Sequence, residues 1–352
     1  GRALVDRVAG VLGGTLLVLT LIMVMASTVV ATIFAPGFLS DPAKLALTGD
    51  LSKLTFPYLL LISLTGFAGA ILNSYQRFAV PALTPILLNL SLIAAALWFA
   101  PGFDEPAVAL ALGVLVAGFA QLLFQVPALA GIGLLPRPRW APRHEGVRRI
   151  MVLMVPALFG VSVSQINLLL DTVLASLLPT GSVSWLYYSD RLTELPLGVF
   201  AIAIATVILP TLSGQRARAA DPAFASTLSW AIRSVLLIAI PAPAALAVLA
   251  EPLLAALFQY GAFSGDDRAM AAASLRAYTL GLGAFMLVKV LAPGFYARED
   301  MRTPVRIGII AMVANMVLNV AFVFPLMWWL NLGHVGLALA TSASAWLNAL
   351  LL

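Results

Sequence analysis

The feature that most constrains this sequence is a series of apolar runs, each about as long as a membrane is thick. A helix needs about 20 predominantly apolar residues to cross the hydrocarbon core, where backbone polar groups must be paired within the protein. The runs cover residues 8–34, 54–74, 80–100, 106–135, 150–178, 183–213, 228–258, 270–296, 304–328 and 334–352. The sequence therefore predicts an all-α, polytopic membrane bundle with about ten transmembrane helices.

Basic residues are shared unevenly between the connections. Of the 20 Lys and Arg residues, 13 fall in one alternating set of connections, whereas the opposite set holds only Lys44, Lys53 and Arg268. Cytoplasmic loops of membrane proteins carry an excess of Lys and Arg, so the first set is predicted to be cytoplasmic. The formal net charge of +5 is then a topology signal, and we expect no nucleic-acid partner.

One long, polar, proline-rich connection at residues 136–149 divides the chain. We predict a partial N-lobe of four helices at 1–135 and a C-lobe of six helices at 150–352. Two similar Tyr-x-Arg turns, at Tyr75 and Tyr296, lie 221 residues apart. This spacing predicts a duplicated unit of about six helices, and internal repeats of that kind build many secondary transporters.

Three charged residues interrupt a predicted span. On a helix, Asp190, Arg191 and Glu194 fall within one arc of about 100°, with Tyr187 on the same side. A charge inside the hydrocarbon costs about 3 kcal/mol on insertion scales, so such residues usually line a pathway. The alternative is a self-neutralising structural cluster in which Arg191 pairs with Glu194.

A second polar group is spread over three predicted helices. Its members are Ser164, Asn167 and Asp171 in the span 150–178, Asn315 and Asn319 in the span 304–328, and Thr341 in the last span. The oxygen atoms of Asp171, Asn315, Asn319 and Thr341 suit a hard cation, and Asp171 alone could carry a coupling proton. The same side chains could instead form hydrogen bonds between neighbouring helices.

The remaining candidates are few. Lys289 lies about two turns from the cytoplasmic end of its span, where it could either extend to the interface or contact an anion in a cavity. His144 and His334 fall in predicted loops and predict no metal site. No phosphate-binding loop, zinc spacing or catalytic triad is present, so we expect no enzyme and no bound cofactor apart from a coupling Na⁺ or H⁺.

Several motifs resemble the MurJ (MviN) family, the lipid II flippases of bacterial peptidoglycan synthesis. The motifs are residues 57–64, 69–78, 160–166, 181–196, 258–261 and 289–296. The resemblance implies the fold of the multidrug/oligosaccharidyl-lipid/polysaccharide exporter superfamily, with fourteen helices in two six-helix lobes and a final pair. This chain, which we expect to be cut at both ends, would hold helices three to twelve.

The resemblance also implies a function. It predicts alternating-access movement of lipid II across the bacterial cytoplasmic (inner) membrane by a monomer, with lipid II and membrane lipids as partners. Arg191, with Asp190 and Glu194, matches an Asp-Arg-x-x-Glu segment whose arginine faces the central cavity. Lys289 lies in another matching motif, and the Asp171 group resembles a sodium site of some members.

The family's other cavity arginines lie in its first two helices, so this chain alone is not expected to transport. A drug or cation antiporter, and a flippase for another lipid-linked oligosaccharide, are the main alternatives. An intramembrane glycosyltransferase would need catalytic carboxylates in an outer loop, where only Asp104-Glu105 and Asp266-Asp267 occur as pairs. A scaffold role would leave the charges of the span 183–213 unexplained.

Overall fold

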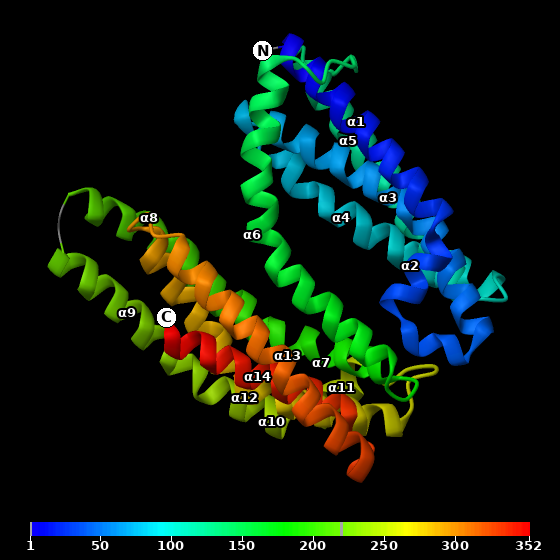
Figure 1. Ribbon diagram of the computed structural model, residues 1–352, viewed down its shortest axis with the longest axis vertical. Coiled ribbons are helices and arrows are strands. Elements are labelled where there is room, and N and C mark those ends of the chain that lie inside the picture. Colours follow the sequence, from blue (N-terminus) through cyan, green and yellow to red (C-terminus); the bar gives the residue numbers. More distant parts are fainter. Residues whose placement is uncertain (1, 219–220) are drawn as a thin grey trace. The chain divides into compact units, whose positions relative to one another are not determined.

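A computed structural model describes residues 2–218 and 221–352, apart from the side chains of residues 153, 155–157 and 159–164. Every regular element in this part of the chain is helical, which confirms the all-α prediction (Figure 1). Nine of the described helical stretches are long and apolar enough to cross a membrane. The remaining predicted span, 150–178, coincides with α6 (Glu145–Ser176), a helix of 32 residues that includes the side chains left aside.

By their internal contacts the residues form two compact units, Gly1–Leu158 and Phe159–Leu352. The division falls within α6, whereas the predicted lobe boundaries at 135 and 150 stay a prediction. Unit 1 contains α1 (Arg2–Met25), α2 (Ser27–Phe34), η1 (Pro36–Ser40), α3 (Pro42–Ser74), α4 (Ala79–Ala94), η2 (Ala95–Phe99), η3 (Ala100–Gly102), α5 (Pro106–Gly131) and the first part of α6. Unit 2 contains the rest of α6, then α7 (Ser182–Pro196), η4 (Leu197–Ile202), α8 (Ala203–Ala217), α9 (Asp221–Ala239), α10 (Pro241–Val248), α11 (Ala250–Phe258), α12 (Gly265–Tyr296), α13 (Arg302–Leu330) and α14 (Gly333–Leu351).

The central helix of unit 2 is α12, which packs against α7, α8, α9, α10, α11 and α14. Small residues let the neighbouring backbones approach closely, as is common between membrane helices. A Cβ atom at Gly281 would lie 2.6 Å from the Cα of Ser342 in α14. The hydroxyl of Ser342 in turn donates to the carbonyl oxygen of Ala277, at 2.8 Å. This crossing of α12 and α14 therefore depends on a glycine and a serine facing each other.

Helix boundaries support a duplication and refine its spacing. α3 and α12 end in the same way: a non-glycine residue in the left-handed region, Gln76 (φ 59°) or Glu299 (φ 61°), follows the last turn. In both caps the next N–H donates back to a carbonyl five residues earlier, the hydrogen bond of a Schellman motif. Gln76 and Glu299 are 223 residues apart, as are the first residues of α3 and α12. Tyr75 and Tyr296, predicted to be equivalent at a spacing of 221, are thus offset by two residues.

The polar connection after α5 is docked on α1, which the sequence did not predict. The backbone N–H of Arg137 donates to the Asp6 carboxylate at 2.8 Å, and the N–H of Arg139 donates to the Asp6 carbonyl oxygen at 2.9 Å. Asp6 is only 7% exposed, and a buried carboxylate needs hydrogen-bond donors. The first half of the predicted linker is therefore a fixed part of unit 1, and we call residues 137–140 the strap.

Two glycines of α1 leave room for the strap. A Cβ atom at Gly10 would overlap the backbone carbonyl group of Arg139. A Cβ atom at Gly14 would lie 2.5 Å from the indole ring of Trp140. Asp6, Gly10 and Gly14 are spaced four residues apart, so they lie along one face of the helix. The strap occupies a groove that only glycine keeps open.

We predict that Gly10→Ala lowers the thermal unfolding temperature, although alanine is the better helix former by up to about 1 kcal/mol. The new methyl group must displace backbone, and overpacking of that kind costs about 1–3 kcal/mol. Gly13→Ala is the matched control, because its Cβ would meet only the Leu64 side chain at an ordinary 3.9 Å. Circular dichroism of the detergent-purified protein measures both. Equal stability of the two variants would contradict a docked strap.

Candidate functional site

α7 has two different faces. Gly181 (φ 104°) makes the turn into the helix. Five residues on one side of α7 are buried: Ser182, Ser189, Leu192, Thr193 and Pro196. The opposite side exposes Tyr187, Arg191 and Glu194. Because 100° separates consecutive residues, this pattern places the charged side chains away from the face that packs in the unit.

The Arg191 guanidinium is held by two neighbours on its own helix. Its Nη1 atom lies 2.7 Å from Oε2 of Glu194, and its Cζ atom lies 4.8 Å from the ring centroid of Tyr187. The Arg191 and Glu194 side chains are 52% and 51% exposed. The ion pair of the structural alternative therefore exists, but it is half exposed and leaves other N–H donors of Arg191 available.

A cavity of about 410 Å³ lies in unit 2 beside this face of α7. Its lining includes Tyr187, Asp190 and Glu194 from α7, Asp171 from α6 and Tyr278 from α12. The structure thus brings together three carboxylates that the sequence placed in two separate groups. The side-chain carboxylate of Asp190 forms no hydrogen bond or ion pair with any residue that the structure describes. One of the three acids in this cavity therefore has no side-chain partner there.

The predicted oxygen-rich group is also assembled. Nδ2 of Asn319 donates to Asp171 at 2.7 Å and to the side-chain oxygen of Asn315 at 3.0 Å. Nδ2 of Asn315 donates to Thr341 at 3.5 Å and to Ser344 at 3.3 Å. Both asparagines are buried, at 1% and 0% exposure. α6, α13 and α14 therefore meet in one polar network, which we call the Asp171 network.

The network satisfies its carboxylate but not all of its amides. Asn167 donates to the second oxygen of Asp171 at 3.4 Å, so both carboxylate oxygens accept a hydrogen bond. The side-chain oxygens of Asn167 and Asn319 have no partner among the described residues. Rotating either amide by 180° would exchange its nitrogen and oxygen, and would present these unpaired oxygens to Asp171.

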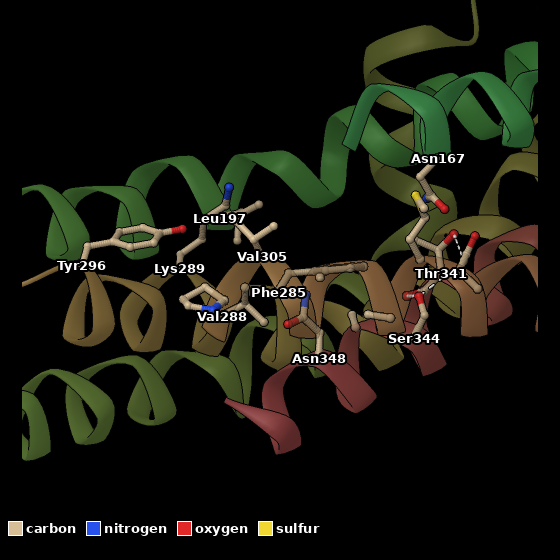
Figure 2. A pocket seen from close by; sticks show the side chains of 16 residues that line it. Asn167, Leu197, Phe285, Val288, Lys289, Tyr296, Val305, Thr341, Ser344 and Asn348 are labelled. Carbon is tan, nitrogen blue, oxygen red and sulfur yellow. Dashed lines mark hydrogen bonds between the residues drawn. The ribbon is translucent and has the colours of Figure 1, made fainter. Parts of the chain in front are cut away.

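A second cavity, of about 510 Å³, adjoins the first, since Asn167, Phe285 and Thr341 line both. Figure 2 shows Lys289 and Tyr296 at one end of it and Asn167 and Thr341 at the other. Lys289, predicted either to extend to the interface or to contact an anion in a cavity, lines this second cavity, whereas Asp190 and Glu194 line the first.

Three further features differ from the sequence analysis or lie beyond it. His334, predicted in a loop, lies in the first turn of α14 with 0% exposure, and its Nε2 is 3.2 Å from the carbonyl oxygen of Met270. Directly after Pro196, the π-helical turn η4 joins α7 to α8; a proline inside a helix was its only sequence signal. Ser164 and the other residues of 160–164, which make up most of the motif 160–166, have side chains outside the described part of the structure. No cluster of three or more His, Cys, Asp or Glu able to hold a metal occurs in the described part of the chain.

Apolar helical spans, a duplicated helix arrangement and charged or amide side chains around internal cavities define a polytopic membrane transporter. A family model described as "Lipid II flippase MurJ" matches residues 1–352. The chain belongs to this family, and it is a multi-pass protein of the bacterial inner membrane.

Individual relatives agree. The chain is 51% identical to "Probable lipid II flippase MurJ" of Vibrio cholerae, with 100% of this chain and 67% of the relative covered. It is 41% identical to "Lipid II flippase MurJ" of Burkholderia cenocepacia, with 100% and 68% covered. The solved structure "Lipid II flippase MurJ, inward closed conformation" matches with a TM-score of 0.83 and 26% identity, over 100% of this chain and 72% of that one. An inward-facing multidrug transporter of the MATE family, with a TM-score of 0.74 and 15% identity, shares the fold.

We predict that Asn319→Leu destabilises the protein more than Asn348→Leu. The leucine removes the donor 2.7 Å from a partly buried carboxylate, and a hydrogen bond to a charged group is worth about 1.5–3 kcal/mol. Asn348 lines the neighbouring cavity and has no side-chain hydrogen bond in the described structure, so it is the matched control. Thermal unfolding in detergent compares the two, and equal losses would argue against the Asp171 network.

Proposed function

We propose that this protein moves lipid II from the inner to the outer leaflet of the membrane by alternating access. Its family and its relatives of 41–51% identity, which are named for this activity, support the proposal. The observation that carries it at the level of residues is a half-exposed arginine that is paired with Glu194, a residue of the cavity lining, on an otherwise well-packed helix. Such a charge is costly in a membrane unless it meets water or a ligand.

Arg191 would bind the pyrophosphate of lipid II. A guanidinium presents several N–H donors in a plane and forms strong, often bidentate hydrogen bonds with phosphate oxygens. Glu194 and the ring of Tyr187 hold the guanidinium from one side and would orient it. Asp190 and Glu194 would balance its charge when no lipid is bound. Lys289, in the adjoining cavity, is a second candidate contact for an anionic group.

The Asp171 network would hold the coupling ion. Its donor set of one carboxylate, two amide oxygens and a hydroxyl fits Na⁺, and Asp171 alone would suit H⁺. The unpaired oxygens of Asn167 and Asn319 support this fit, because they are buried acceptors without a donor in the described structure. When bound, the cation would neutralise Asp171, and the amides of Asn315 and Asn319 would turn their oxygens toward it. Coupling to the gradient of this ion or to the membrane potential would drive transport.

The drug or cation antiporter is not favoured, because the relatives that cover the whole chain carry the flippase name. A monomeric state and specific membrane-lipid partners stay predictions.

We predict that Arg191→Ala in the intact protein abolishes lipid II flipping without loss of membrane insertion. Arg191→Lys should retain little activity, because an ammonium group cannot replace the planar set of donors. A leaflet-specific assay of lipid II accessibility measures both. Arg276→Ala is the matched control: Arg276 forms a similarly exposed ion pair with Glu251, at 3.0 Å. Normal flipping by Arg191→Ala would refute this role of the arginine.

We predict that Asp171→Asn removes the dependence of flipping on the coupling ion. Flipping in proteoliposomes is measured against Na⁺ concentration at constant pH, and against a pH gradient without Na⁺. The parent should respond to one of the two, and the variant to neither, because an amide cannot change its charge. Asp266→Asn, an exposed acid in the first turn of α12, should behave like the parent. An unchanged ion response in Asp171→Asn would exclude this network as the coupling site.

A further inference from the structure

Two side-chain hydrogen bonds join α7 to α12 at the same offset in the sequence. Nε1 of Trp185 donates to Oδ1 of Asp267 at 2.7 Å, and the hydroxyl of Ser189 donates to the carbonyl oxygen of Ala271 at 2.7 Å. Both pairs are 82 residues apart, and on each helix the two members lie four residues apart. α7 and α12 therefore run parallel here, with two successive turns of one tied to two successive turns of the other.

Neighbouring groups restrict both partners of the hydrogen bond between Trp185 and Asp267. Asp267 uses its other oxygen to accept from the N–H of Ser264, at 2.8 Å, in the capping box that starts α12. The buried ring of His334 meets the Trp185 ring edge-on, with 4.9 Å between centroids. A Cβ atom at Gly181 would lie 2.6 Å from the indole. Neither the indole nor its acceptor can move far without disturbing the ends of α12 and α14.

The core cluster that Leu192 of α7 shares with α12 is apolar and does not fix the register of the two helices. Leu192 shares one core cluster with Ala271, Ala272 and Leu275, which are all small or flexible. In a membrane, such contacts gain little over contacts with lipid tails, because both are apolar. A slip of one turn would exchange one apolar neighbour for another. The two hydrogen bonds are directional, and a slip would break both.

We propose that Trp185 and Ser189 are positioning residues that set the register of α7 on α12. They lie on the buried face of α7, whereas Arg191 and Glu194 lie on the opposite, exposed face. A one-turn slip would move Arg191 by about 5.4 Å along the helix axis. The two ties thereby fix the depth at which this arginine meets its ligand, and this consequence for transport rests on the proposed function.

Disulfide cross-linking tests the register directly, because the chain contains no cysteine. Leu192→Cys is paired in turn with Leu275→Cys, which lies within one residue of the position that the 82-residue offset of the two hydrogen bonds places opposite Leu192. The comparison pairs use Ala271→Cys or Thr279→Cys, four residues away on either side. Each pair is oxidised in membranes, both in the parent and in the double variant Trp185→Phe/Ser189→Ala. Phenylalanine keeps an aromatic ring at this position but removes the N–H donor together with part of the indole volume.

In the parent, we expect the pair with Leu275→Cys to form most of the cross-linked product. In the double variant, the ratio of out-of-register to in-register product should rise about tenfold, which corresponds to about 1.4 kcal/mol. Ser189→Thr alone, with Trp185 unchanged, keeps the hydroxyl and should give the same cross-linking ratio as the parent. The matched control is Trp230→Phe/Ser226→Ala in α9, where Trp230 is 57% exposed and Ser226 bonds only to its own helix, so the ratio should not change.

Two results would overturn the proposal. An unchanged cross-linking ratio in Trp185→Phe/Ser189→Ala would show that other contacts set the register. A shifted ratio with normal lipid II flipping would show that the depth of Arg191 does not matter. The cross-linking does not involve lipid II, so failure of the proposed function appears separately, as normal flipping by Arg191→Ala.

Discussion

The whole structure depends on one property of hydrocarbon: it offers a helix no polar partner and no reason to prefer an apolar neighbour over lipid. Helix formation satisfies the backbone, but it does not decide which helices meet or in which register. In both units that decision rests on a few polar side chains and close glycine contacts. The strap on α1, the crossing of α12 with α14 and the ties from α7 to α12 all follow this rule.

On α7, the polar side chains that bond to α12 lie on a different face from the polar side chains proposed to act in transport. One face uses a tryptophan and a serine to hold the helix in place. The other presents Asp190 and Glu194 to a cavity and leaves Arg191 half exposed beside Glu194. The site can therefore change its charge or ligand without loosening the helix packing. In the proposed role of Arg191 this independence matters, because an arginine tied to a neighbouring helix would not be free to bind and release a substrate.

The two units have similar helix arrangements but differ in the polar side chains that link the helices. α3, α4 and α5 of unit 1 are linked by neutral groups: Tyr58 donates to Gln121 at 3.1 Å, and Gln121 and Gln125 donate to Thr84 at 3.2 and 3.1 Å. Their counterparts in the repeat are α12, α13 and α14. There the amide of Asn319 on α13 donates to the carboxylate of Asp171 on α6 and to the side-chain oxygen of Asn315. The group of Tyr58, Gln121, Gln125 and Thr84 in unit 1 contains no acid, whereas the corresponding group in unit 2 contains Asp171, which accounts for placing the candidate ion site there.

The sequence alone was enough to predict the spans, the all-α class, the polar face of α7 and the members of the Asp171 network, because these follow from local hydropathy and helical periodicity. Only the tertiary structure decided that Asp171 and Asp190 line one cavity, that Lys289 lines another, that His334 is buried and that the strap lies on α1. Each of those facts concerns residues far apart in the chain. Their contacts depend on helix register and on close backbone approach, which periodicity within a single helix does not encode.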